Sequence, residues 1–293
     1  MNLQEFARSH NCIIGTCDAL PLDESQYNDF VPFVSTDIKK RTDPTAILPG
    51  ATGVIVVGVG QNQPKGTNSS TEGSAMLSSL GTDEDYHIRV RTLLRQLVSE
   101  LKQHYNFKHK VLIDSPNLDE RAFAVRAGLG FLGRNRLVIS QKFGSRFNIG
   151  LLLHDIPGIP ATEATQQSCP PNCRLCIDAC PAKVLQFNRS VFTTSWFCIS
   201  YLTQKKELTA QEENLLVKSN QLYGCDICQN ICPFNATCET NFVNPRIWLC
   251  MDDATFKENY GHTAMLWQGT ELLRRNARIA MPPATCYNSN IKM

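Results

Sequence analysis

Two closely spaced runs of cysteine in the second half of the chain limit its possible folds more than any other feature. The first run begins at Cys169 and ends at Cys180-Pro181, and the second begins at Cys225 and ends at Cys232-Pro233. Two such runs, each closing on Cys-Pro, are typical of proteins that hold a pair of [4Fe–4S] clusters. The fold must therefore gather thiolates around two redox centres, and the sequence predicts a protein that transfers electrons.

The spacing also predicts which cysteines share a cluster. In two-cluster ferredoxins the last cysteine of one run binds the other cluster. The first predicted site therefore combines three cysteines of the first run with the last of the second: Cys169, Cys173, Cys176 and Cys232. The second predicted site takes the cysteines left over and a single one between the runs: Cys180, Cys198, Cys225 and Cys228.

Two other uses of these cysteines are less favoured. Disulfide frameworks belong to short chains in oxidising compartments, and the N-terminal residues show no apolar signal segment. Paired structural zinc sites can use Cys-x2-Cys units, but they rarely place three short spacings before Cys-Pro. The spacing between Cys169 and Cys173 is one residue longer than the usual ferredoxin spacing, so the Pro170-Pro171 loop must bow to deliver its thiolate. The remaining cysteines are expected to be core or surface thiols: Cys12, Cys17, Cys238, Cys250 and Cys286.

Length and composition predict a cytoplasmic protein with two cores. The chain has 293 residues and 42% hydrophobic content, which suffices for two cores, and no apolar stretch is long enough to cross a membrane. The net charge of +2 by itself indicates no nucleic-acid partner. Residues 121–154, however, contain six Lys or Arg and no Asp or Glu. That segment is either a solvated basic face or a groove for an anionic substrate such as RNA.

Hydrophobic periodicity predicts a mixed unit of helices and strands before the cysteines. Apolar positions recur with helical spacing over residues 85–105, and a shorter helix is expected over 119–127, ended by Gly128. Residues 60–79 are expected to form a long polar loop. Short apolar runs predict strands at 53–58, 110–113, 137–140 and 147–153. Later helices are expected at 211–216, 254–260 and 270–281.

A glycine motif in this unit tempts a nucleotide-binding interpretation. Gly128, Gly130 and Gly133 match the dinucleotide fingerprint, which requires a preceding strand and a following helix. Here a helix is predicted before the motif and a strand after it, so nicotinamide binding is disfavoured. The glycines then either form a turn with positive φ or allow close approach of a large flat ligand.

Several segments in chain order resemble the epoxyqueuosine reductase family of cobalamin-dependent iron–sulfur enzymes. Reductive dehalogenases are more distant relatives of the same plan. The matching segments cover Arg41–Pro44, Leu48–Ala51, Asp85–His87, Asp114–Ser115, Glu120–Arg121, Ala127–Asn135, both cysteine runs, Cys198–Thr203, Gly224–Gln229 and Arg274–Ala277. The chain departs from the family at Phe131, Arg134 and Arg136, where Trp, Lys and Thr are usual, and these departures bear on the substrate.

The resemblance implies an α+β fold with three parts. A nitroreductase-like cobalamin domain is expected over 1–155, a double-cluster ferredoxin-like domain over 156–240, and a short helical C-terminal segment over 241–293. The implied reaction is the two-electron deoxygenation of epoxyqueuosine to queuosine in the tRNA anticodon region, with electrons from an external low-potential donor.

The resemblance also implies roles for single residues. Asp114 is expected to be the acid that protonates the developing alkoxide, and to do so at neutral pH it would need a pKa raised by burial against the corrin. The residues expected to line the corrin are Tyr86, His87, Gly128, Gly130 and Asn135. Two alternatives stay open: a related corrinoid iron–sulfur reductase of another small substrate, and an electron-transfer protein that binds no corrin.

Overall fold

A computed structural model describes residues 2–27, 33–62, 72–186, 197–236 and 239–281. By its internal contacts the chain divides into two compact units. Unit 1 contains residues 1–62, 84–196 and 227–238, and unit 2 contains residues 63–83, 197–226 and 239–293. Each unit is made of segments that are separated in the sequence. The limits of the units therefore differ from those of the three domains expected from the sequence, and those domains remain a prediction.

Unit 1 is built on a four-stranded antiparallel sheet with the strand order β1-β2-β7-β4. The strands and helices of unit 1 are β1 (Cys12–Asp18), β2 (Gly53–Gly60), β4 (His109–Leu112), β5 (Phe131–Leu132), β6 (Val138–Ile139), β7 (Phe147–His154), α1 (Leu3–Ser9), α2 (Ile38–Thr42), α3 (Tyr86–Lys102), α4 (Glu120–Arg126), α5 (Leu175–Ala179) and α8 (Ile227–Asn230).

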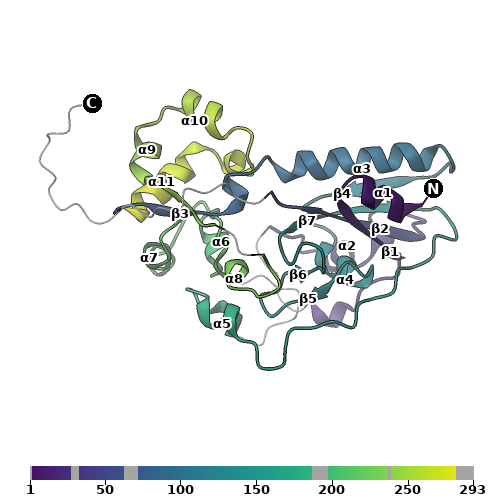
Figure 1. Ribbon diagram of the computed structural model, residues 1–293. Helices are drawn as coiled ribbons and strands as arrows, with labels where there is room; N and C mark the ends of the chain where they lie inside the picture. The colour runs from purple at the N-terminus through teal and green to yellow at the C-terminus, as the bar shows by residue number, and fades with distance from the viewer. Residues whose placement is uncertain (1, 28–32, 63–71, 187–196, 237–238, 282–293) are drawn as a thin grey trace, which may run out of the picture. The chain divides into compact units, whose positions relative to one another are not determined.

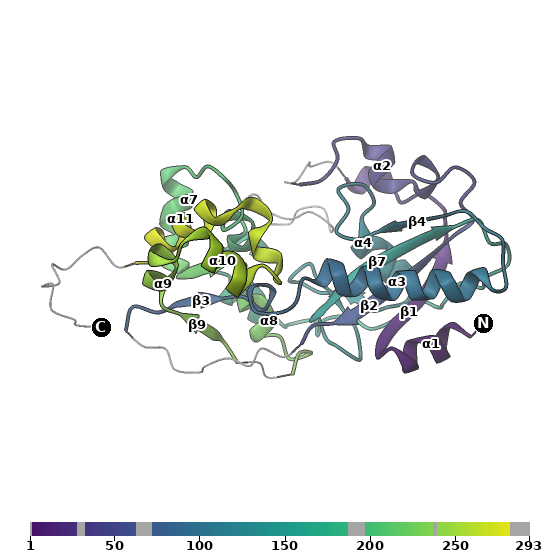
Figure 2. The same ribbon diagram turned by 90° about the horizontal axis from the view of Figure 1, so that it is seen from above.

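Alternate residues of the central strands point to opposite faces of this sheet, and helices cover both faces. Ile55 and Val57 of β2 belong to a core with α1 and α3, whereas Val54 and Val56 belong to a core with α4. Figure 2 shows α3 lying lengthwise over the sheet. Burial on both faces explains the uninterrupted apolar run of β2. The same packing holds α3 and α4 against the sheet.

Most predicted elements of unit 1 are confirmed. The strands expected at 53–58 and 147–153 are β2 and β7, and the two predicted helices are α3 and α4. Gly128 follows the end of α4 with φ at 74°, and β5 comes next. The order helix, glycine motif, strand is therefore the one that disfavours dinucleotide binding.

Unit 2 combines a three-stranded sheet, ordered β8-β3-β9, with five helices among the described residues. Figure 1 shows α9, α10 and α11 gathered beside β3. The core contains fully buried Trp248, Phe256 and Leu273. The elements of unit 2 are β3 (Ala75–Leu77), β8 (Gln221–Tyr223), β9 (Asn241–Val243), α6 (Ile199–Leu202), α7 (Ala210–Ser219), α9 (Pro245–Cys250), α10 (Asp253–Tyr260) and α11 (Thr270–Ala280).

The polar loop expected over residues 60–79 is wrong in part. Ala75–Leu77 form β3, which pairs with β8 in parallel and with β9 in the antiparallel sense. A strand of three residues is too short for a period to be recognised, and both of its partners lie more than 140 residues later. The central part of this segment, residues 63–71, lies outside the described residues.

Candidate functional site: a cysteine pocket and a carboxylate at the end of β4

Four cysteines meet in one pocket within unit 1. The pocket is lined by Cys169, Cys173, Cys176 and Cys232, the four predicted to bind the first cluster. Cys176 lies in α5 and Cys232 follows α8, and these two short helices lie side by side (Figure 1). The helical turns therefore bring cysteines from the two runs into one place.

The donor set of this pocket fits an iron–sulfur cluster. Four thiols with apolar walls are what a cubane requires of a protein. Cys176 and Cys232 are buried, and burial raises the pKa of the Cys176 thiol to about 11. In the described residues no three His, Cys, Asp or Glu side chains lie close enough to hold one metal ion. The four thiols of the pocket fit the cluster expected from the cysteine spacing.

The sequence analysis did not identify the side chains that hold the Cys232 segment of this pocket in place. The Asn235 side chain accepts a hydrogen bond from the Ser145 backbone N–H at 2.7 Å and donates one to the Gln229 carbonyl at 2.7 Å. A Cβ on Gly144 would lie 2.0 Å from Asn235 Oδ1. Gly144 therefore permits the segment with Cys232 to approach the loop before β7 closely.

Two of the three departures from the family pattern lie at the same pocket. Phe131 is buried and its ring meets that of Phe234 edge to face, with centroids 5.2 Å apart. The Arg134 guanidinium donates a hydrogen bond to the Pro171 carbonyl, inside the lengthened loop between Cys169 and Cys173. Both departures therefore concern the surroundings of the first cysteine set.

The four cysteines predicted for the second cluster divide between the units. Cys180 caps α5 and Cys228 lies in α8, both in unit 1. Cys198 and Cys225 belong to unit 2. The assignment of these four cysteines to one cluster remains a prediction.

Within unit 2, a buried network fixes the segments that carry Cys198 and Cys225. Cys198 is the N-cap of α6, and Thr203 at the C-terminal end of that helix accepts a hydrogen bond from the Gly224 N–H, next to Cys225, at 2.9 Å. Fully buried Asn276 donates to the Thr203 and Leu222 carbonyls, at 2.8 Å each.

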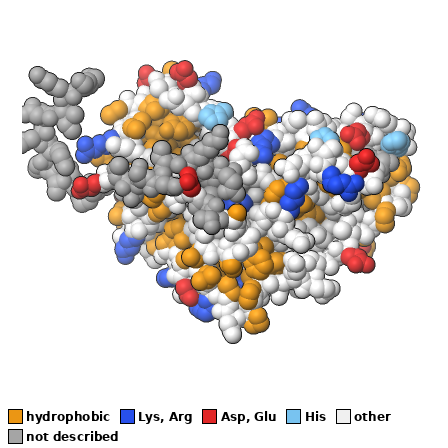
Figure 3. All heavy atoms as spheres, in the orientation of Figure 1, with side chains coloured by type: hydrophobic (Ala, Val, Ile, Leu, Met, Phe, Trp, Pro, Cys, Tyr) orange, Lys and Arg blue, Asp and Glu red, His pale blue; other side chains and the backbone are white. Residues whose placement is uncertain are grey.

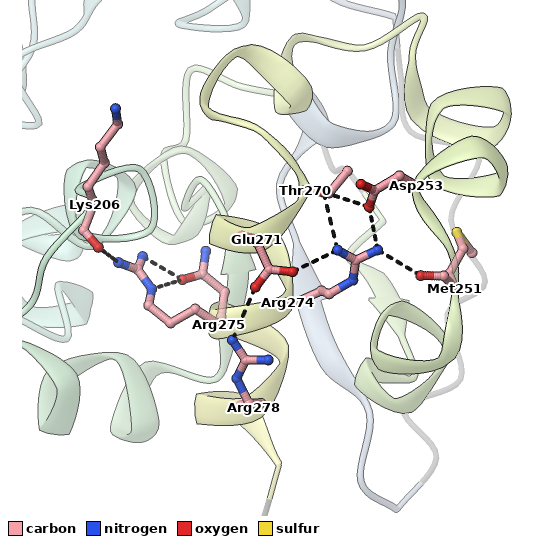
Figure 4. A network of polar contacts seen from close by, with 9 residues as sticks. Lys206, Met251, Asp253, Thr270, Glu271, Arg274, Arg275 and Arg278 are labelled. Carbon is pink, nitrogen blue, oxygen red and sulfur yellow. Dashed lines mark hydrogen bonds and ion pairs between the residues drawn. The ribbon is translucent and has the colours of Figure 1, made fainter.

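The Arg274–Ala277 segment of α11 surrounds this network with further contacts (Figure 4). Arg275 donates to the Lys206 carbonyl at 2.7 Å, and Arg274 bonds to Asp253 at 2.6 Å and to Glu271 at 2.8 Å. These arginines connect α11 to neighbouring segments of unit 2. The structure thus gives the matched segment a structural role.

A second candidate site lies where β4 ends, at Asp114. Asp114 has φ at 47°, a left-handed conformation that is uncommon outside glycine and concentrates at functional positions. The Tyr86 hydroxyl donates a hydrogen bond to Asp114 Oδ2 at 2.7 Å. His87 Nε2 lies 3.7 Å from the same oxygen. The first turn of α3 therefore delivers both side chains to one carboxylate.

The rest of α3's first turn holds His87 in place. His87 Nδ1 is 2.8 Å from Asp85 Oδ1, and the His87 ring stacks on the Tyr86 ring with centroids 4.1 Å apart. Asp85 is also the N-cap of the helix and accepts the His87 backbone N–H. One carboxylate thus begins the helix and orients the imidazole.

In this structure the neighbours of Asp114 lower its pKa, whereas the expected rise depends on burial against a corrin and remains a prediction. The neighbouring His87 lowers the pKa of Asp114, and the Tyr86 hydrogen bond adds to this. Asp114 in turn raises the pKa of His87. A raised carboxyl pKa occurs nearby instead, because burial raises that of Glu120 to about 8. Glu120 Oε1 accepts the Ser115 backbone N–H at 3.1 Å.

Replacing Asp114 with Asn should lower the pKa of His87. The substitution removes the first cause of the raised value, while burial of the imidazole continues to lower it. The His87 ring would then lose its proton at a lower pH than in the unmodified protein. Titration of the histidine ring signals by NMR, with His87→Gln for assignment, measures the shift. An unchanged His87 pKa would show that the two side chains are not coupled in solution.

The other residues expected to line the corrin make contacts of their own within the chain. A Cβ on Gly128 would lie 2.4 Å from the Glu163 carbonyl oxygen, and one on Gly130 would lie 2.1 Å from that of Ile139. Both glycines are thus needed for packing within the chain. Asn135 lines the cysteine pocket. Their corrin contacts remain predictions, whereas Tyr86, His87 and Asp114 do lie together.

Most of the six cations in the basic segment 121–154 make contacts within the chain. Arg121 lies 3.8 Å from Asp119, Arg126 lies 3.7 Å from Asp18, and Lys142 donates to the Cys12 carbonyl. Arg146 is buried. On the face drawn in Figure 3, Lys and Arg side chains are scattered and form no continuous band. Several cations of this segment therefore serve contacts within the chain.

Other cysteines lie outside the predicted ligand sets. Cys12 and Cys17 are buried in β1, as expected for core thiols, and Cys250 is exposed. Cys238 and Cys286 fall outside the described residues. None of the helices in the described ranges is both long and apolar enough to cross a membrane.

Two family models match segments that contain the candidate sites. A family model described as "4Fe-4S double cluster binding domain" matches residues 168–235, and one described as "Epoxyqueuosine reductase QueG, DUF1730" matches residues 41–115. The epoxyqueuosine reductase of Staphylococcus aureus is 35% identical over 264 residues, which cover 85% of this chain and 68% of that protein.

Two solved structures extend the comparison. An epoxyqueuosine reductase with an epoxyqueuosine-modified tRNA-Tyr stem loop has a TM-score of 0.83 and 27% identity, covering 95% of this chain and 79% of that one. The epoxyqueuosine reductase of Bacillus subtilis, with its catalytic aspartate loop swung out of the active site, has a TM-score of 0.81 and 26% identity, covering 95% and 80%. The mixed helix-and-sheet fold expected from the sequence is therefore confirmed.

Proposed function

The chain belongs to the epoxyqueuosine reductase family, and from this premise we propose that it is an oxidoreductase that converts epoxyqueuosine to queuosine in tRNA. The reaction removes the epoxide oxygen with two electrons and two protons, so that oxygen leaves as water and a carbon–carbon double bond remains. The observation that carries the proposal is the Asp114 carboxylate, in a left-handed backbone conformation and in contact with Tyr86 and His87.

Asp114 and its neighbours would manage the protons of this reaction. When the epoxide opens, negative charge develops on its oxygen and requires a proton. Its two neighbours favour the ionised form of Asp114, and Asp114 raises the pKa of His87, so His87 would supply the proton that Asp114 passes to the substrate oxygen. The Tyr86 hydroxyl fixes the carboxylate in position. A relative whose structure has a catalytic aspartate loop supports an aspartate in this role.

The electrons would pass through two [4Fe–4S] clusters, supplied by an external low-potential donor. The pocket of Cys169, Cys173, Cys176 and Cys232 fits the first cluster. The second would use the predicted set of Cys180, Cys198, Cys225 and Cys228.

Cobalamin is the second proposed cofactor. The stacked rings of Tyr86 and His87 beside Asp114 offer a flat surface and a proton carrier at one place, which fits a corrin next to the reacting bond. We therefore propose that Tyr86 and His87 contact the corrin. Bound cobalamin would supply a strongly reducing cobalt centre to the epoxide.

A groove beside Asp114 supports contact with RNA. The groove has a volume of about 610 Å³ and contains Arg91 and Arg95 of α3, Lys110 of β4, and Asp114. Cations beside a reacting carboxylate fit a substrate whose backbone carries a phosphate at every nucleotide. This places the proposed phosphate contacts on α3 and β4.

Replacing both Arg91 and Arg95 with Gln should weaken binding of a tRNA anticodon stem loop and flatten its dependence on salt. Each lost phosphate contact lowers the slope of log affinity against log salt by about 0.7 to 0.9. Fluorescence anisotropy at several salt concentrations measures both quantities. The control is the double variant Arg8→Gln and Lys39→Gln, which removes two exposed cations elsewhere in unit 1. Equal slopes in the two double variants would exclude the groove.

The activity test uses epoxyqueuosine-containing tRNA, the chain with both clusters and cobalamin, and a low-potential reductant. Formation of queuosine, detected by mass spectrometry of the digested tRNA, is the expected result. A chain that holds its clusters and cobalamin but leaves the epoxide intact would overturn the proposed substrate.

A further inference from the structure

One side chain in the cysteine pocket has an unused hydrogen-bond donor. Asn135 is 6% exposed and lines the pocket formed by the first cysteine set. Its Nδ2 is buried and has no hydrogen-bond partner among the described residues. A buried amide donor without an acceptor costs free energy, so such a group in a functional pocket indicates an acceptor supplied by a ligand.

The direction of the Asn135 amide is fixed by the backbone around it. Asn135 lies in the turn between β5 and β6, where the Gly133 N–H donates to the Leu137 carbonyl at 2.8 Å. Asn135 Oδ1 accepts the Leu137 N–H at 3.2 Å. Exchanging the oxygen and nitrogen of the amide would place two donors against each other. The oxygen therefore faces the turn, and the NH₂ group is the free end.

The pocket offers sulfur as the acceptor. Apart from Asn135 and the cysteines, its lining side chains have no acceptor atom: Arg134, Ile139, Leu175, Pro233 and Phe234. A cluster in this pocket brings thiolate and sulfide sulfurs, which accept hydrogen bonds and gain negative charge when the cluster takes up an electron. The unused donor and the missing acceptor thus complement each other.

We propose that Asn135 Nδ2–H donates a hydrogen bond to a sulfur of the [4Fe–4S] cluster held by Cys169, Cys173, Cys176 and Cys232, and that this bond raises the reduction potential of that cluster. The inference rests on the proposed ligand set of the first cluster. In one-electron reduction by the external donor, the added electron stays on the cluster, and a hydrogen bond to sulfur stabilises the more negative, reduced form more than the oxidised one.

The test compares midpoint potentials of the reconstituted full chain by EPR-monitored redox titration. In Asn135→Leu, which removes the donor, the equilibrium constant for reduction of one cluster should fall about tenfold, equivalent to about 59 mV for one electron. The other midpoint should not change. Asn135→Asp keeps an acceptor for the Leu137 N–H but adds negative charge, so its fall should be larger. Asn2→Asp makes the same chemical change at the exposed N-cap of α1 and should leave both midpoints unaltered.

If both Asn135 variants bind their full complement of iron and keep the midpoint potentials of the unmodified chain, the inference is overturned. The proposed ligand set of the first cluster would not be affected by that result. Iron analysis distinguishes failure of this inference from failure of the ligand set. If the ligand set is wrong, Cys176→Ser keeps its full iron content. If the Asn135 variants lose iron, the unmodified chain with ¹⁵N in its asparagine side chains is used. Pulsed EPR of the reduced clusters should then detect a coupled asparagine ¹⁵N, and absence of any such coupling would also overturn the inference.

Discussion

Asp114→Asn is expected to lower the rate of queuosine formation by about 10²- to 10⁴-fold, the usual contribution of a general acid. An amide cannot transfer the proton that a carboxyl passes from His87 to the substrate oxygen. Asn also adopts the left-handed backbone conformation with little strain, and its oxygen can still accept the Tyr86 hydroxyl. The measurement is single-turnover conversion of epoxyqueuosine-containing tRNA with excess reductant.

The control for Asp114→Asn is Asp252→Asn. Asp252 is the N-cap of α10, a position that Asn fills equally well, so its activity should match that of the unmodified chain. Iron content and the visible spectrum of bound cobalamin must be the same in all three proteins. Full activity of Asp114→Asn under these conditions would remove Asp114 from the catalytic role.

The Cys176→Ser chain is expected to lose one whole cluster. Cys176 is buried in the pocket beside the other three cysteines of its set, so no exposed thiol can replace it. Iron per chain should fall from about eight to about four after anaerobic reconstitution, and queuosine formation should stop. Iron and sulfide analysis, together with EPR of the reduced protein, measures the loss.

Cys250→Ser provides the matched comparison. Cys250 is exposed, ends α9 and belongs to neither predicted set, so its replacement should leave about eight irons per chain. If Cys176→Ser retained as much iron as Cys250→Ser, the proposed ligand set of the first cluster would be wrong.

The sequence predicted the elements whose signals are local. β2, α3 and α4 follow from apolar periodicity within a single segment, and Gly128 marks the end of α4 because a positive φ favours glycine. The first cysteine set was also predictable, since the short spacings within each run and the ferredoxin rule leave few possible pairings. The structure brings those four cysteines together in one pocket.

Three features could not be predicted because they depend on contacts between different elements. β3 exists through partners more than 140 residues away. Asn135 lines the cysteine pocket, and this position depends on how the β5–β6 turn meets the cysteine loops. The carbonyl of Ile139 explains Gly130, and no local pattern reveals that contact.

The sequence set the chemistry available to this chain, because the spacing of its thiols and the presence of an aspartate carboxyl are covalent features that folding does not alter. How that chemistry is tuned was decided only by the tertiary structure. Packing α3 against the sheet brings Tyr86 and His87, 28 and 27 residues earlier in the chain, to Asp114. Both contacts favour the ionised form of Asp114, since electrostatic effects depend on distance in space and not along the chain.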